Sequence, residues 1–167
     1  MKKYEFTEET KCFAGHTLHR IRAVSDFGDV HTGDLGGWVE SESNLSHTGD
    51  AWVYGDAKVY GDARVYGDAR VYGDAKVYGN ALVYGDAIIK SAIHYMTIGP
   101  IGSRNDFVTF TRDKSGEIFA SVGCFYGDIA EFRAKVKGTH GESRHAKTYL
   151  MAADLAEAQI DTTPIEG

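Results

Sequence analysis

Cysteine, proline and long hydrophobic runs are all scarce in this sequence, and each scarcity argues against a class of protein. The 167 residues include two prolines and two cysteines, and Cys12 and Cys124 lie far apart, outside any CxxC motif. This usage argues against a disulfide scaffold and suits a reducing cytoplasm. No stretch of about 18 apolar residues occurs, which argues against a membrane-spanning helix. No apolar segment follows the basic start MKK, so we expect no signal peptide.

Basic residues are also outnumbered by acidic ones. The chain has 18 Lys and Arg against 24 Asp and Glu, and its formal net charge is −6. An excess of negative charge disfavours nonspecific binding to nucleic acid, although a local basic patch remains compatible with it. We therefore expect a cytoplasmic protein that does not bind membranes or bulk nucleic acid.

Glycine, in contrast, is abundant, and a six-residue repeat explains much of that abundance. The chain has 20 glycines, and from Val59 to Gly79 it reads VYGDARVYGDARVYGDAKVYG. A period of six does not follow an α-helix, because successive valines would fall about 240° apart around the helix axis. The period suits one short strand followed by one corner.

The alternation within a hexad predicts which side chains are buried. If residues 57–60 form a strand, Ala57 and Val59 point to one side while Lys58 and Tyr60 point to the other. The following Gly-Asp pair forms the corner, because glycine accepts a positive φ and aspartate is common in turns. We therefore expect valine and alanine inside and tyrosine, lysine and arginine outside.

The repeat resembles that of the hexapeptide-repeat left-handed parallel β-helix family. An aliphatic residue and an alanine recur together every six residues, at Val53, Val59, Val65, Val71, Val77, Val83 and Ile89 and at Ala51, Ala57, Ala63, Ala69, Ala75, Ala81 and Ala87. In that family three hexads, or 18 residues, make one triangular coil, so the resemblance implies about four coils over residues 33–92. Lys58 should then lie under Lys76. We expect capping strands in residues 1–32, because a solenoid needs irregular ends.

The six outward tyrosines are open to two interpretations. They are Tyr54, Tyr60, Tyr66, Tyr72, Tyr78 and Tyr84. As ordinary strand formers they would make cross-strand and cation–π contacts with their neighbours. The resemblance also implies a homotrimer about the helix axis, and one tyrosine-rich face would then form the subunit interface.

Residues 93–167 follow a different pattern and predict a small α+β domain of three strands and two helices. Asp128 with Glu131 resembles a capping box, and Gly138 is expected to end the helix that starts there. The expected strands are Ile93–Ile98, Phe107–Arg112 and Ile118–Phe125, and the second helix is Ser143–Ile160. The fold class is therefore mainly β: a left-handed parallel β-helix followed by an α+β appendage. Hexads followed by GPIGSRNDFVTF and GCFYGDIAEF are similar to small proteins encoded by phages and prophages.

The candidate ligand site lies in the segment IGPIGSRND. Its glycines allow close backbone approach, and Arg104 offers a fork suited to phosphate or carboxylate. It is not a Walker A loop, because the lysine is absent and the spacing differs. The alternative is a turn whose polar side chains satisfy their own backbone. The predicted ligand-binding set is Gly102, Ser103, Arg104, Asn105, Asp106, His94 and Tyr95.

Other reactive side chains give weaker signals. Cys124 with His140 and His145 has the chemistry of a nucleophile and a base, but we expect Cys124 to be a buried small residue, and we assign no catalytic residue. No spacing of ligands resembles a zinc site, and we expect no metal or cofactor. The helical segment carries a basic set that with Arg104 would form a cationic lip or simply a solvated face. Its members are Arg133, Lys135, Lys137, Arg144 and Lys147.

Three functions remain open after this reasoning. The first is a non-enzymatic binding protein, a trimer that sequesters a small anionic ligand such as a nucleotide second messenger, in a counter-defence role implied by the phage resemblance. The second is a protein-binding inhibitor module that acts on a host macromolecule. The third is an acyltransferase, the commonest activity of the family. Such enzymes usually use a histidine base beside the coils, and this chain has no histidine between His47 and His94. Fold alone does not decide among them.

Overall fold

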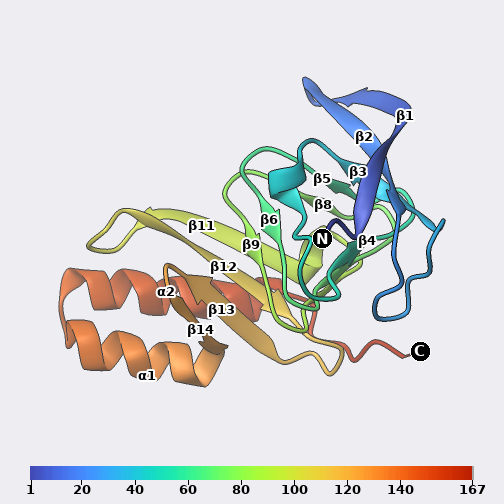
Figure 1. The fold of residues 1–167 in the computed structure, drawn as a ribbon. Helices are drawn as coiled ribbons and strands as arrows, with labels where there is room; N and C mark the ends of the chain where they lie inside the picture. The colour runs from blue at the N-terminus through green and yellow to red at the C-terminus, as the bar shows by residue number, and fades with distance from the viewer. Residues whose placement is uncertain (167) are drawn as a thin grey trace. The chain divides into compact units, whose positions relative to one another are not determined.

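The computed structural model describes residues 1–166, and the chain is mainly β. It divides into two compact units, Met1–Ala92 and a second that starts at Ile93 (Figure 1). The first unit holds the hexads together with the N-terminal strands, and the second holds a four-stranded sheet and both α-helices. Among the described residues, no helix is long and apolar enough to cross a membrane.

The hexads form seven two-residue strands that pair in parallel. Each of the first four strands pairs with the strand three hexads further along, as in Lys58 with Lys76 and Trp52 with Arg70. The predicted 18-residue register is therefore confirmed. Successive strands lie in turn on three sheets, in the orders β5-β8, β4-β7-β10 and β6-β9. Their bounds are β4 Trp52–Val53, β5 Lys58–Val59, β6 Arg64–Val65, β7 Arg70–Val71, β8 Lys76–Val77, β9 Leu82–Val83 and β10 Ile88–Ile89.

The interior of the repeat consists of the expected valines and alanines. Every repeat valine from Val53 to Val83 is fully buried, and so is every repeat alanine from Ala51 to Ala81. The tyrosines stack in pairs one coil apart, with ring centroids 4.3 Å apart for Tyr54 and Tyr72 and 4.5 Å apart for Tyr66 and Tyr84. Cross-strand pairs of this kind contribute roughly 0.2–1 kcal/mol each. The repeat is therefore a scaffold built from small, regular increments.

The N-terminal strands join the repeat and do not stand apart from it. β1 (Tyr4–Phe13) and β2 (His16–Ala23) form an antiparallel hairpin, and β2 pairs with β3 (Leu35–Val39). β3 then pairs in parallel with β5, so the hairpin continues one sheet of the repeat. Leu18, Trp38 and Tyr60 form a buried cluster where the two meet. A short 3-10 helix, η1 (Glu42–Asn44), precedes the regular coils.

The first residues also satisfy the open edge of the repeat. In these stacked strands backbone N–H groups donate to carbonyl oxygens of the next coil. Among the residues that the structure describes, no strand pairs with β4 on its other side, so the carbonyl oxygens beside β4 receive no hydrogen bond from a preceding strand. The Lys3 amine donates to the carbonyl oxygens of Gly49 (3.0 Å) and Ala51 (2.6 Å). The Tyr4 hydroxyl donates to the carbonyl oxygen of Leu45 at 2.9 Å. These side chains replace the missing backbone donors.

The second unit is an antiparallel sheet packed against two helices. The strands follow the order β11-β12-β13-β14 and are β11 Tyr95–Ile101, β12 Asp106–Arg112, β13 Ile118–Val122 and β14 Phe125–Asp128. The helices are α1 Ile129–His140 and α2 Arg144–Gln159. Val108, Phe110 and Ala120 of the sheet pack with Phe132 and Ala153 of the helices in one buried core.

The structure corrects three predicted boundaries in this unit. Ile118–Phe125 is not one strand, because Gly123, with φ +53°, turns the chain between β13 and β14 and gives four strands in place of three. The first strand starts at Tyr95, after a 3-10 helix η2 (Ala92–His94). Helix α1 continues past Gly138 to His140, because Gly141, with φ +57°, supplies the C-cap.

The predicted helix starts are confirmed. The Asp128 side chain accepts a hydrogen bond from the Glu131 N–H at 2.8 Å, and the Glu131 carboxylate accepts one from the Asp128 N–H, also at 2.8 Å. Ser143 caps the start of α2 by accepting from the Ala146 N–H. Both caps give partners to N–H groups of the first turn that have none within the helix, reciprocally at α1 and through the Ser143 side chain alone at α2.

Candidate functional site

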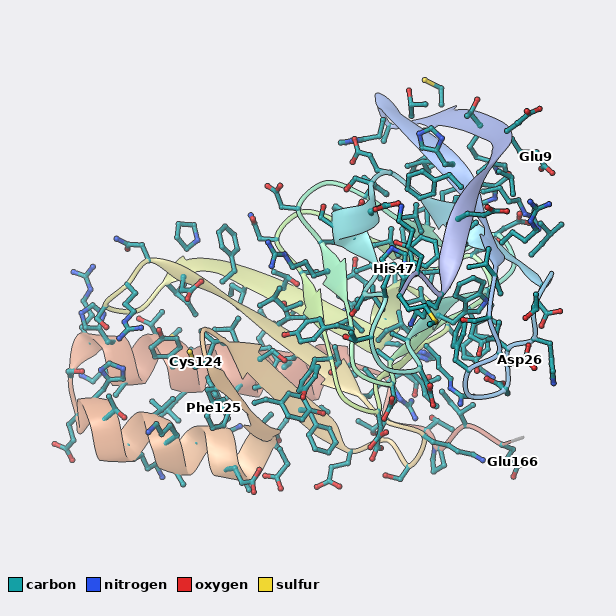
Figure 2. All side chains as sticks on the ribbon, viewed as in Figure 1. Glu9, Asp26, His47, Cys124, Phe125 and Glu166 are labelled. Carbon is teal, nitrogen blue, oxygen red and sulfur yellow. The ribbon has the colours of Figure 1, made fainter. Side chains whose placement is uncertain are left out.

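A cavity of about 290 Å³ lies in the second unit, where the β11–β12 and β13–β14 turns meet the helices. Figure 2 shows Cys124 and Phe125 at the β13–β14 turn, beside the two helices. The lining draws on four separate parts of this unit. Its polar members are Ser103, Arg104, Asp106, Cys124, Lys135, Thr139, His140 and Tyr149, and its apolar members are Val122, Gly123, Phe125, Phe132 and Val136.

The β11–β12 turn places three of the predicted ligand residues on this cavity. Gly102 has φ +78° and its carbonyl accepts from the Asn105 N–H, which closes the turn. Ser103 and Arg104 are exposed at its tip, and Asp106, half-buried, follows. A Cβ on Gly102 would lie 1.9 Å from the Tyr149 hydroxyl oxygen. Only glycine therefore lets this phenol approach the turn so closely.

Helix α1 supplies the opposite wall. Phe132, Lys135, Val136, Thr139 and His140 all line the cavity and are spaced three or four residues apart. Side chains at these spacings share one face of a helix. Helix α2 adds Tyr149, whose ring stacks on the His140 ring at 5.6 Å between centroids. The wall is therefore partly aromatic and partly cationic.

The charges at the cavity are two cations and one carboxylate. In the part of the chain that the structure describes, the charged groups of Arg104 and Lys135 form no ion pair or hydrogen bond. Burial raises the pKa of the Tyr149 phenol; the Asp106 carboxylate raises this pKa further, and the Arg104 cation lowers it. Both charges thus act on the same hydroxyl group.

Other lysines and arginines of the basic set lie away from this cavity. Arg133 points away from the cavity and donates to Asp154 (2.8 Å) and Glu157 (2.7 Å) of α2. Lys137 and Lys147 line a second hollow. Of the helical cations predicted to form a lip, Lys135 alone lies on the cavity lining together with Arg104.

His94 and Tyr95 do not reach the cavity. His94 ends η2 and Tyr95 starts β11, whereas Ser103 and Arg104 follow the end of β11, and seven residues of strand span roughly 20 Å. His94 is buried and its Nε2 lies 3.8 Å from the Asp161 carboxylate. Proximity in the sequence suggested one site, but the intervening extended strand separates its two halves.

Cys124 and His140 are brought to the same cavity, whereas His145 is not part of the lining. The expectation that Cys124 is buried is wrong: the thiol is exposed, because the residue lies at the tip of the β13–β14 turn. Sequence reasoning missed Tyr149, Thr139 and the aromatic wall. A sequence signal existed for part of the aromatic wall: Phe132, Val136 and His140 are spaced four residues apart and therefore share one face of a helix.

The predicted interface tyrosines differ in accessibility. Tyr60 is 7% exposed and packs on the rings of Phe13 (5.8 Å) and His16 (4.9 Å) of the N-terminal hairpin. Its own chain therefore covers it, which removes it from a subunit interface. Tyr54 donates to Asp29 at 2.9 Å, whereas Tyr78 is 53% exposed. Tyr66, Tyr72 and Tyr84 are half-buried.

The donor set of the cavity suits an anion better than a metal ion. Across residues 1–166, no group of three His, Cys, Asp or Glu side chains is placed to hold a metal. Arginine and lysine provide only N–H donors, with Arg104 able to bind two oxygens at once. Ser103 and Thr139 add hydroxyl groups at the same cavity. The arrangement favours phosphate or carboxylate.

Comparison with known proteins identifies the repeat. A family model described as the YdcK beta solenoid repeat matches residues 57–73, 63–76 and 75–90. The hexad region is a β-solenoid. The chain is also similar to the protein named "Uncharacterized acetyltransferase YdcK" of Escherichia coli (strain K12), with 37% identity over 62 residues. That match covers 32% of this chain and 19% of the relative, so the chain spans about a fifth of the relative's length. The solenoid match ends at residue 90, before the first residue of the cavity lining.

Proposed function

We propose that this protein is a non-enzymatic binding protein that holds a small anionic ligand, such as a nucleotide, in the cavity beside Arg104. The observation that carries the proposal is that Arg104 and Lys135, two cations that form no ion pair within residues 1–166, line one cavity of about 290 Å³ with an aromatic wall. Arginine binds phosphate through two parallel hydrogen bonds. Aromatic rings such as Phe125 and His140 offer surfaces on which a nucleobase stacks.

We further propose that the solenoid is a left-handed parallel β-helix of about four triangular coils and that it assembles the protein into a trimer. The 18-residue register of the strands supports a three-sided coil. In this proposal the protein is of the small phage or prophage type, works in the host cytoplasm and sequesters a nucleotide second messenger of host defence. Light scattering tests the trimer directly, and a monomeric mass would rule it out.

The binding proposal is tested by calorimetry with adenosine 5′-monophosphate as the probe. Arg104→Ala should weaken binding about tenfold or more, because a hydrogen bond between charged groups contributes about 1.5–3 kcal/mol. Arg144→Ala is the matched control, since Arg144 is an exposed arginine of α2 outside the cavity lining. Equal affinity of the Arg104→Ala variant and the wild-type protein would contradict the proposal, as would an absence of binding to the wild-type protein.

An acyltransferase is the second candidate, and the name of the Escherichia coli relative is the observation that favours it. The shared region is short, and the regular coils lack a histidine between His47 and His94. Release of free CoA from acetyl-CoA, followed with a thiol reagent against a panel of amine acceptors, tests this candidate. Turnover above the background rate would favour it over the binding protein. The inhibitor module acting on a host macromolecule stays a prediction of the sequence.

A further inference from the structure

Asp106 places a negative charge in a cavity whose other charged groups suit an anion. Its carboxylate is the acidic group of a lining that otherwise carries Arg104, Lys135 and His140. One oxygen, Oδ1, accepts from the Phe107 N–H at 2.8 Å. The other, Oδ2, lies beside the β13–β14 turn, 3.7 Å from where a Cβ of Gly123 would be. Across residues 1–166, this second oxygen accepts no hydrogen bond.

This carboxylate favours a ligand that donates a hydrogen bond to it. An ionised carboxylate accepts hydrogen bonds and donates none, so a ligand that displaces water from Oδ2 leaves this oxygen unpaired, at a cost in free energy, unless the ligand supplies a donor. A ligand that is anionic throughout would meet repulsion from Asp106. A ligand that carries an anion and, apart from it, an N–H donor satisfies both the cations and the carboxylate.

We propose that the ligand of this cavity is a mononucleotide whose base carries an amino group, and that Asp106 accepts a hydrogen bond from that amino group. This inference rests on the proposed function. Arg104 and Lys135 are exposed, whereas Asp106 is half-buried. The phosphate therefore binds the cations at the rim, and the base edge reaches inward to Asp106.

The walls and the volume of the cavity favour one base and one phosphate. Phe125, Phe132, His140 and Tyr149 place aromatic rings along the lining. The volume of about 290 Å³ is near the lower end of the roughly 300–1,000 Å³ typical of ligand sites. One base and one phosphate match this volume better than the two bases and two phosphates of a cyclic dinucleotide.

Three related probes test the inference by calorimetry on the full-length protein. Adenosine 5′-monophosphate carries the amino group, purine riboside 5′-monophosphate lacks only that group, and ribose 5-phosphate lacks the base. We expect the purine riboside compound to bind about tenfold more weakly than adenosine 5′-monophosphate, or weaker still, because the carboxylate loses its donor. Ribose 5-phosphate should bind more weakly again.

The Asp106→Asn variant assigns the preference to this residue. The amide keeps an oxygen for the Phe107 N–H, and its nitrogen takes the place of the free acceptor. Adenosine 5′-monophosphate should then bind no better than the purine riboside compound. Asp113→Asn is the control, because Asp113 accepts from the Ser115 and Glu117 N–H groups in the β12–β13 turn, away from the cavity.

The possible outcomes distinguish a failure of this inference from a failure of the proposed function. Equal binding of the two purine nucleotides to the wild-type protein overturns the inference and leaves an anion site. The same conclusion follows if a folded Asp106→Asn variant still prefers adenosine 5′-monophosphate to the purine riboside compound as strongly as the wild-type protein does. Equal binding of ribose 5-phosphate also overturns it. Failure of all three probes to bind overturns both the inference and the proposed function. If Asp106→Asn does not fold, the comparison of probes on the wild-type protein still decides.

Discussion

Replacing Gly67 by alanine is expected to destabilise the solenoid more than the same change at Gly79. Both glycines occupy the corner position of a hexad and have a positive φ, +71° and +65°. That conformation alone costs alanine about 1 kcal/mol. At Gly67 the added Cβ would also lie 2.9 Å from the Gly85 nitrogen and 3.0 Å from two ring carbons of Tyr84. At Gly79 it would meet no atom of the described residues within 4 Å.

The steric contact sets the size of the difference. Overpacking of this kind costs about 1–3 kcal/mol, so Gly67→Ala should lose about 2–4 kcal/mol against about 1 kcal/mol for Gly79→Ala. Urea unfolding followed by tryptophan fluorescence measures both, because the two tryptophans, Trp38 and Trp52, lie in the solenoid unit. Equal losses in the two variants would contradict the close stacking of the corners. No loss in either variant would contradict the left-handed backbone.

Two further changes test the Lys3 hydrogen bonds at the open edge of the repeat and the position of Tyr149 in the cavity wall. Burial lowers the pKa of Lys3 to about 8. Between pH 8 and 10.5 the unfolded chain therefore binds more protons at this residue, and the free energy of unfolding should rise with pH. Lys3→Met should reduce that rise, leaving the part due to Lys58, whose pKa burial also lowers. The change should cost about 1–3 kcal/mol at pH 7 through two carbonyls without donors. Gly102→Ala should displace Tyr149 and weaken nucleotide binding about tenfold or more. Gly138→Ala, at an exposed position in the last turn of α1, should leave binding intact and stabilise the helix by up to about 1 kcal/mol. An unchanged affinity in Gly102→Ala, or a pH profile shared by Lys3→Met and the wild-type protein, would contradict these assignments.

The repeat was predictable because one local rule recurs without interruption. A hexad of strand and corner fixes both which side chains are inside and, through its period, which residues stack one coil apart. The pairing of Lys58 with Lys76 needed, besides this period, the resemblance to a family in which three hexads make one coil. The helix starts at Asp128 and Ser143 were predictable for a similar reason, since capping is decided within four residues.

The cavity was predictable only in part, because it joins side chains from distant segments. The β11–β12 turn carried its own signal in Gly102–Asp106, and Arg104 does line the cavity. Its partners Lys135 and Tyr149 depend on how two helices pack on the sheet, which no local pattern specifies. The hydrophobic run across residues 118–125 concealed a turn at Gly123 and with it the exposed position of Cys124.

A nucleotide bound in the cavity beside Arg104 should shield the cysteine on the cavity lining, and the two cysteines of the chain test this directly. Both thiols are exposed, Cys124 on the cavity lining and Cys12 on the N-terminal hairpin of the other unit. Alkylation by iodoacetamide, followed by peptide mass spectrometry, gives the rate at each site in one sample. Saturating adenosine 5′-monophosphate should slow alkylation of Cys124 and leave Cys12 unchanged. Equal rates at Cys124 with and without the nucleotide would contradict the claim.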